Sequence, residues 1–271
     1  MVPKPRRFKL EPQQLRIYGI VGSVIGVYLT QFLNSALHTT VFSFLGSLAA
    51  IFAVLWGANA IRRICAYGLG TGVPSMGMLA IGMAMVAAIF GLNVAEQFGL
   101  GLAGVIVALV YALVFGYIIG TICNKVIKFN IPIMEEGLTD ISGACTMAIL
   151  CWGITVSGSL GYNILVKDVF NTGFLAMIFI LGGMAMFHPF NANLGPDEKQ
   201  DRTLVNGMMV SGVAMIAMGI CSILTLGLMT GMVTIVVGFA LWYYTYIWYF
   251  RLAKMDAAAV VGTGLLPPSA L

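Results

Sequence analysis

The sequence predicts an all-α fold: a polytopic bundle of about eight membrane-spanning helices with both termini in the cytoplasm. Two features of the chain predict this fold. Long apolar runs alternate with short polar connections, and nearly all Lys and Arg residues fall in every second connection. Of the 271 residues, 60% are hydrophobic and 9% are charged, whereas soluble domains carry about 25% charged residues. The composition therefore excludes an ordinary soluble domain.

Each predicted helix is an apolar run of the length that a bilayer requires. A helix crosses the hydrocarbon core with about 20 residues, and roughly 17–25 is the usual range. Residues 1–16 form a basic N-terminal tail, residues 17–250 one membrane domain, and residues 251–271 a C-terminal tail. The predicted spans are Ile17–Leu33, Thr40–Ile61, Val73–Ala95, Phe98–Cys123, Ile141–Val166, Val169–Phe187, Leu204–Leu226 and Leu228–Phe250.

The boundary between the last two spans depends on a weak signal. No charged residue occurs between Leu204 and Phe250, and this stretch is too long for a single crossing at about 1.5 Å per residue. A hairpin is predicted near Gly227, Thr230 and Gly231. Without that hairpin the chain would have seven spans, which is the alternative.

The basic residues predict the orientation, because short loops rich in Lys and Arg stay in the cytoplasm. Lys167 is the single basic residue predicted on the outer side. The remaining thirteen of the 14 Lys and Arg residues lie in the two tails and in the second, fourth and sixth connections: Lys4, Arg6, Arg7, Lys9, Arg16, Arg62, Arg63, Lys125, Lys128, Lys199, Arg202, Arg251 and Lys254.

The last span ends in aromatic residues followed by cations, an arrangement typical of a helix end at the depth of the lipid headgroups. We interpret this segment as a cytoplasmic membrane-interface anchor. Its residues are Trp242, Tyr243, Tyr246, Trp248, Arg251 and Lys254.

No predicted span contains Asp, Glu, Lys, Arg or His in its interior. A charge at mid-bilayer costs about 2.5–3.5 kcal/mol on insertion scales and marks sites that handle ions or protons. The sequence therefore leaves open whether this chain has any sodium ligand; a site made of backbone carbonyls and hydroxyls is one alternative.

His38 and His188 are predicted on opposite sides of the membrane, so they cannot form one site and no catalytic residues are predicted. The five cysteines form no CxxC pair, and we interpret them as packing residues.

Glycines four residues apart recur along the chain, as at Gly22 and Gly26, Gly116 and Gly120, and Gly227 and Gly231. Small residues at this spacing let helix backbones approach closely in a membrane. The pattern favours a tightly packed bundle.

Three polar stretches are predicted on the cytoplasmic side. The first runs from Arg62-Arg63 through Tyr67-Gly68-Leu69-Gly70-Thr71-Gly72-Val73-Pro74-Ser75. The second contains Ile131-Pro132-Ile133, an acidic pair and Ile141-Ser142-Gly143-Ala144. The third begins His188-Pro189-Phe190-Asn191-Ala192 and closes in Arg202-Thr203-Leu204.

These three phrases, in this order, resemble the C subunit of tetrahydromethanopterin S-methyltransferase, a membrane complex of methane-producing archaea, and the hydrophobic layout is similar over nearly the whole chain. The resemblance implies a multi-pass subunit, without catalytic residues or a cofactor of its own, in the cell membrane. The complex transfers a methyl group from methyl-tetrahydromethanopterin, or methyl-tetrahydrosarcinapterin, to coenzyme M and couples this transfer to sodium export. The corrinoid is carried by a partner subunit.

The resemblance also implies partners: the D and E membrane subunits and membrane lipids, but no nucleic acid. We expect this chain to wall the ion route and to dock cytoplasmic subunits. A stand-alone secondary transporter or channel is the alternative, and a purely structural spacer is a third. The candidate docking or ion-mouth residues are the charged residues of the second and third stretches: Glu135, Glu136, Asp197, Glu198, Asp201 and Arg202.

Overall fold

A computed structural model of the chain describes residues 9–66, 73–193 and 199–261. Over these residues the chain forms helices joined by short connections, and no strand is found in them. The long helices are α1 (Pro12–Ala36), α2 (Phe44–Cys65), α3 (Val73–Gln97), α4 (Gly104–Thr121), α5 (Met134–Ser157), α7 (Phe174–Asn193), α8 (Gln200–Leu226) and α9 (Leu228–Val261). Short elements are η1 (Val41–Ser43), η2 (Gly101–Ala103), η3 (Ile122–Val126), α6 (Tyr162–Ile164) and η4 (Leu165–Phe170).

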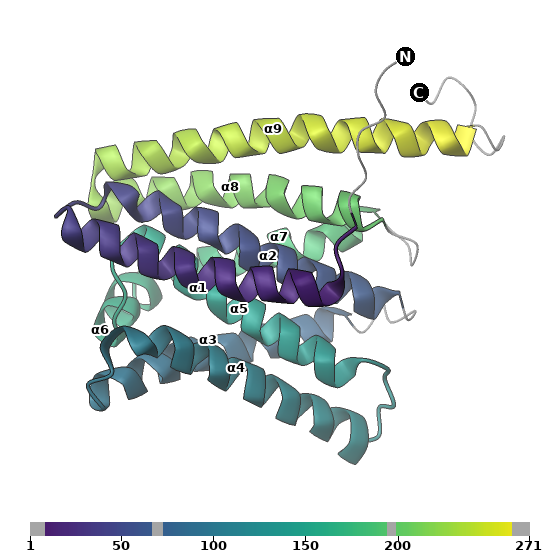
Figure 1. Cartoon of the computed structure of the whole chain (residues 1–271), viewed down its shortest axis with the longest axis horizontal. Helices are drawn as coiled ribbons and strands as arrows, with labels where there is room; N and C mark the ends of the chain where they lie inside the picture. Colours follow the sequence, from purple (N-terminus) through teal and green to yellow (C-terminus); the bar gives the residue numbers. More distant parts are fainter. Residues whose placement is uncertain (1–8, 67–72, 194–198, 262–271) are drawn as a thin grey trace.

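The prediction of a polytopic all-α bundle is confirmed. Seven helices in the described ranges are long and apolar enough to cross a membrane, and the number is eight if the bent pair Tyr162–Phe170 and Phe174–Phe187 is one span. α8 and α9 lie on one side of the bundle and α3 and α4 on the other, with α5 between them (Figure 1). α1 begins and α9 ends at the same end of the bundle.

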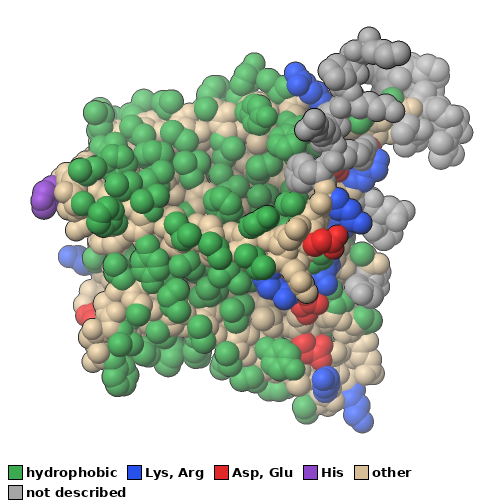
Figure 2. Space-filling view, in the orientation of Figure 1, with side chains coloured by type: hydrophobic (Ala, Val, Ile, Leu, Met, Phe, Trp, Pro, Cys, Tyr) green, Lys and Arg blue, Asp and Glu red, His purple; other side chains and the backbone are tan. Residues whose placement is uncertain are grey.

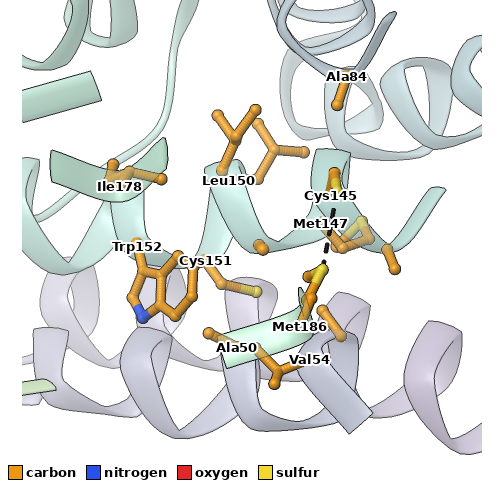
Figure 3. Packing of buried hydrophobic residues seen from close by; sticks show 14 of the residues in the cluster. Ala50, Val54, Ala84, Cys145, Met147, Leu150, Cys151, Trp152, Ile178 and Met186 are labelled. Atoms are coloured by element: carbon orange, nitrogen blue, oxygen red, sulfur yellow. Dashed lines mark hydrogen bonds between the residues drawn. The ribbon is translucent and has the colours of Figure 1, made fainter. Parts of the chain in front are cut away.

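Helix α5 is the centre of the fold, because it packs against α1, α2, α3, α4, α7 and α8. In its most apolar stretch, 94% of the residues are buried. Figure 3 shows Cys145, Leu150 and Trp152 of this helix among side chains from α2, α3 and α7. Cys145 Sγ lies 3.7 Å from Met186 Sδ of α7.

Glycines permit the closest helix contacts, as the sequence predicts. A Cβ built on Gly26 of α1 would lie 2.2 Å from the Cβ of Ala49 in α2. In the α8–α9 pair, a Cβ on Gly231 would lie 2.5 Å from the carbonyl oxygen of Gly219. Side chains at these positions would force the backbones apart.

The predicted hairpin between the last two spans is confirmed, with a single residue as its turn. α8 ends at Leu226 and α9 begins at Leu228. The residue between them, Gly227, has φ +100° and ψ 168°, a region essentially restricted to glycine.

The predicted boundaries of the fifth and sixth spans are wrong. Helix α5 begins at Met134 rather than Ile141 and stops at Ser157, because Gly158 adopts φ +76° and ends the helix. The segment Tyr162–Phe170 then makes an angle of 83° with Phe174–Phe187. The predicted sixth span, Val169–Phe187, therefore contains a sharp bend at Gly173, which has φ +80°.

Candidate functional site

Charged side chains gather at the end of the bundle where α1 begins and α9 ends, which we call the charged end. Figure 2 shows most of the Lys, Arg, Asp and Glu side chains of this face concentrated there, with hydrophobic side chains spread over the middle of the face. Lys167 belongs to η4, which follows the far end of α5, and so it lies at the opposite end. The alternation of helix directions thus places the basic residues that the structure describes as the sequence predicts, while the side of the membrane that this end faces stays a prediction.

An ion-pair network at the charged end joins α1, α2 and α5. Arg16 of α1 donates from Nε to Asp140 Oδ1 over 2.7 Å and from Nη2 to Asp140 Oδ2 over 2.8 Å. Its Nη2 also contacts Glu136 Oε1 at 2.5 Å. Arg63 of α2 donates to the same Glu136 carboxylate over 2.9 and 3.2 Å. Two guanidinium groups therefore face two carboxylates. The two hydrogen bonds between Arg16 and Asp140 make that pair bidentate, which is the strong form of an Arg–carboxylate contact.

Asp140 corrects the prediction that every carboxylate lies in a connection or a tail. It is 3% exposed and lies in the second turn of α5, because that helix begins seven residues earlier than predicted. A buried carboxylate requires a partner, and Arg16 supplies it from a position 124 residues away in the chain. The helices of this chain are therefore not free of charge, although Asp140 is neutralised within the chain.

The acidic pair predicted for docking occupies the first turn of α5. Glu136 belongs to the network described above. Glu135 accepts a hydrogen bond from Asn124 Nδ2 over 3.0 Å, and Lys125 Nζ lies 3.8 Å from it. Both carboxylates line an open groove of about 510 Å³ between α1, α4 and α5, together with Arg16 and Tyr117. Negative charge in the first turn also suits the positive end of the helix dipole.

The third polar stretch is divided by the structure. Asp197 and Glu198 lie outside the described residues. Asp201 and Arg202 lie in the first turn of α8 rather than in a loop, and Asp201 Oδ1 accepts the backbone N–H of Arg202 over 3.0 Å. The structure thus brings Asp201 and Arg202 to the charged end, on a different helix from Glu135 and Glu136.

Asp256 is a residue that the sequence analysis missed. It is 9% exposed and accepts hydrogen bonds from Lys199 and, over 3.5 Å, from Arg202 Nη1. Helix α9 continues to Val261, and this extension carries Asp256 to the start of α8. In the sequence, Asp256 stands between Lys254 and a run of alanines. That position alone does not indicate which basic residues it pairs with.

A second contact ties the N-terminal segment to the same end. Gln200 of α8 bonds both backbone groups of Leu10, at 2.8 and 2.9 Å, and donates to Asn59 Oδ1 over 3.0 Å. Arg62 Nε donates to that oxygen over 3.2 Å. Leu10, which lies just before α1, is therefore held close to α2 and α8.

Of the aromatic residues predicted as an anchor, Trp242 and Tyr246 form a row on α9 together with Phe250. Trp242 and Tyr246 have ring centroids 5.5 Å apart, and Tyr246 and Phe250 are 4.7 Å apart. Tyr243 is 55% exposed and Tyr246 is 40% exposed. Trp248 packs instead against Tyr244, with ring centroids 6.2 Å apart, and Arg251 and Lys254 are exposed on the following turn. The role of these residues as a membrane-interface anchor stays a prediction.

The five cysteines form no disulfide and are buried. In the described part of the chain, no three His, Cys, Asp or Glu side chains lie close enough together to hold a metal ion. The interactions that the described residues make at the charged end are ion pairs and hydrogen bonds.

The sequence is similar to proteins of one family along nearly its whole length. A family model for the C subunit of tetrahydromethanopterin S-methyltransferase matches residues 3–270. The C subunit of Methanosarcina mazei is 49% identical over 257 residues, which are 94% of this chain and 92% of the relative. The C subunits of Methanothermobacter thermautotrophicus and Methanocaldococcus jannaschii are 35% and 36% identical, over 97% and 94% of this chain and 96% and 93% of their own lengths. Together with the seven or eight spans, these matches show that the chain is a membrane protein that belongs to the family of the tetrahydromethanopterin S-methyltransferase C subunit.

Proposed function

We propose that this chain is a non-catalytic, membrane-embedded subunit of the complex that transfers a methyl group from methyl-tetrahydromethanopterin, or its sarcinapterin counterpart, to coenzyme M. The observation that carries the proposal is the family match over residues 3–270. In this proposal the methyl transfer is coupled to sodium export, the corrinoid belongs to a partner subunit, and this chain lies in the cell membrane beside the D and E subunits.

The charged end supports a docking role on the cytoplasmic side. Basic residues in short connections favour that orientation. The groove lined by Glu135, Glu136 and Tyr117 is open and has a volume of about 510 Å³, so it can accept a side chain from a partner. Because Glu136 already pairs with Arg16 and Arg63, a cation from a partner would join an existing network rather than neutralise a free charge.

The same network supports a passive role in sodium transport. Asp140 is buried and held by two hydrogen bonds from Arg16, so a sodium ion would have to displace a guanidinium group to bind there. In the proposal, the carboxylate that carries sodium is therefore supplied by a neighbouring subunit, and this chain forms part of the wall of the route.

Reconstitution tests the proposal against the stand-alone transporter. The chain purified alone and the complete complex are inserted into separate vesicles, and sodium uptake is measured with and without methyl donor and coenzyme M. We expect sodium movement from the complex only. Sodium or solute flux through the chain alone would contradict the proposal.

A set of charge substitutions tests the docking surface. Neutralising Asp197, Glu198, Asp201 and Arg202 together is expected to disassemble the complex or to uncouple methyl transfer from sodium export, as measured by subunit recovery after affinity purification and by sodium dependence of the activity. Asp168→Asn at the opposite end is the matched control. Unchanged assembly and unchanged coupling in the fourfold variant would refute the docking role and favour a purely structural spacer.

A further inference from the structure

The groove between α1, α4 and α5 at the charged end changes from polar to apolar along its length. Helix α5 lies between α1 and α4 (Figure 1), and both of these helices pack against it. Glu135 and Glu136 line the mouth of the groove, in the first turn of α5. Ile20 of α1 and Leu113 of α4 line it farther from the charged end. A molecule that fits this groove therefore has a polar part and an apolar part.

The groove opens toward the apolar outer surface of the bundle. Next to its walls, Ile17 of α1 is 57% exposed and Val114 of α4 is 53% exposed. On membrane-spanning helices, apolar faces of this kind are in contact with lipid tails, which are as apolar as a leucine side chain. A molecule that enters the groove from this side therefore comes from the bilayer.

Arg16 has two hydrogen-bond donors left over in the groove. A guanidinium group has five N–H donors, and Arg16 uses three of them, one on Nε and two on Nη2, for Asp140 and Glu136. No described residue accepts a hydrogen bond from its Nη1. This atom is accessible, since the Arg16 side chain is 34% exposed and Nη1 is not buried. Tyr117 also lines the groove and is 55% exposed. Phosphate oxygens are the acceptors that suit an arginine donor and a tyrosine hydroxyl.

The same groove has carboxylates that can receive a cation. Glu135 Oε1 lies 3.8 Å from Lys125 Nζ, which is too far for a hydrogen bond, and the Glu136 side chain is 42% exposed. Among the described residues around the groove, three cations face three carboxylates, so the charges balance. They are Arg16, Arg63 and Lys125 on one side and Glu135, Glu136 and Asp140 on the other. An occupant without net charge preserves this balance.

We infer that the groove binds the headgroup of a zwitterionic phospholipid that carries an ammonium group. The phosphate accepts hydrogen bonds from Arg16 Nη1 and from the Tyr117 hydroxyl, and the ammonium group pairs with Glu135. The upper part of an acyl chain lies against Ile20 and Leu113. A lipid with a phosphate and no ammonium group fits less well, because its negative charge would stand beside carboxylates without a cation of its own.

A lipid at this site takes the place that a partner's cation would occupy at Glu135 and Glu136. It leaves Asp201 and Arg202, which are on α8, for the docking of subunits. Binding of the lipid is independent of methyl transfer, so the site and the proposed function can be refuted separately.

Native mass spectrometry of the full chain in detergent micelles tests the inference. The chain is titrated with phosphatidylethanolamine and, separately, with phosphatidylglycerol that has the same acyl chains. We expect one molecule of phosphatidylethanolamine to bind with a dissociation constant at least fivefold lower than that of phosphatidylglycerol. Equal affinity for the two lipids would overturn the inference, because the groove would then not distinguish the ammonium group.

Two substitutions separate the two halves of the headgroup. Glu135→Gln keeps the shape of the side chain and should weaken phosphatidylethanolamine binding to the level of phosphatidylglycerol. Tyr117→Phe should weaken the binding of both lipids at least threefold, since both contain the phosphate. Asp168→Asn, at the opposite end, is the control and should bind as the wild type does. Unfolding in mixed micelles checks that each variant is folded. A folded Glu135→Gln chain that still prefers phosphatidylethanolamine would contradict the assignment.

Photo-cross-linking in the complete complex distinguishes a lipid from a partner subunit. Vesicles that contain the complex and a phosphatidylethanolamine with a diazirine in its acyl chain are illuminated, and the cross-linked peptides of this chain are identified. We expect cross-links in α4 near Leu113 that excess phosphatidylethanolamine suppresses and phosphatidylglycerol does not. Absence of these cross-links would mean that a segment of a partner fills the groove, and the inference would be wrong. Normal assembly and sodium-coupled methyl transfer alongside that result would leave the proposed function intact.

Discussion

Replacing Arg16 with Met tests how much the ion-pair network contributes to the stability of the bundle. The substitution keeps an unbranched side chain that replaces the apolar stem of Arg16, but leaves Asp140, which is 3% exposed, without the guanidinium group that donates two hydrogen bonds to it. Removing one partner of a fully buried ion pair costs about 3–5 kcal/mol. The Arg16 side chain is 34% exposed, so water recovers part of that cost. We therefore expect the free energy of unfolding to fall by about 2–3 kcal/mol.

A double-mutant cycle isolates the interaction. Asp140→Leu alone leaves Arg16 with Glu136 as its partner, and the double variant Arg16→Met with Asp140→Leu replaces the pair by apolar groups, which is often close to neutral. We expect a coupling energy of about 2 kcal/mol.

Unfolding of the chain in mixed micelles, followed by circular dichroism as the fraction of sodium dodecyl sulfate rises, provides the measurement. Lys125→Met is the control, because Lys125 is 68% exposed and 3.8 Å from Glu135, and exposed pairs contribute about 0–1 kcal/mol. If Arg16→Met stays within about 0.5 kcal/mol of the wild type, or if the two single effects simply add, then the argument from burial is wrong.

Three other substitutions test the packing, each by the same unfolding measurement. Gly227→Ala should destabilise the chain by about 1–3 kcal/mol, because its φ of +100° and ψ of 168° belong to glycine; an unchanged stability would mean that the hairpin can rearrange. Gly26→Leu should cost at least about 1–3 kcal/mol through overpacking, since its Cβ would lie 2.2 Å from that of Ala49, whereas Gly82→Leu, with nothing within 4 Å of its Cβ, should be tolerated. Trp152→Ala should cost about 3–5 kcal/mol, because the side chain is 1% exposed; a loss below about 1 kcal/mol would show that its surroundings collapse into the space.

Hydropathy predicts most crossings of this chain because every helix that spans the lipid needs about 20 predominantly apolar residues. It also predicts the α8–α9 turn, since a charge-free stretch that exceeds one crossing must contain a reversal and Gly227 is one of its turn formers. The one-sided distribution of basic residues follows from the same alternation, and it places Arg16, Arg63, Lys199 and Lys254 at one end without any knowledge of their contacts.

Prediction from the sequence failed where a local signal conflicted with a distant contact. Asp140 and the acidic pair before it indicate a connection when they are considered alone, and the partner that lets α5 include them, Arg16, lies 124 residues away. Gly158 ends α5 within a stretch that has no charged residue up to Val166. Hydropathy alone therefore predicted a longer helix than the one observed. The Asp256 contact with Lys199 was missed for the same reason, because pairs of this kind depend on the three-dimensional arrangement.

The enclosure of α5 has a consequence for how the chain enters the membrane. α1 and α5 share the lowest mean hydropathy among the seven long spans, and they are the helices that Arg16 and Asp140 connect. Isolated in lipid, each would carry an uncompensated charge near one end. During synthesis α1 and α2 emerge before α5. Arg16 and Arg63 are therefore already present when α5 packs against these two helices. Biogenesis of this chain can therefore be expected to retain the early helices near the insertion machinery until α5 arrives, and a truncated chain that ends before Met134 should be retained or degraded rather than released into the bilayer.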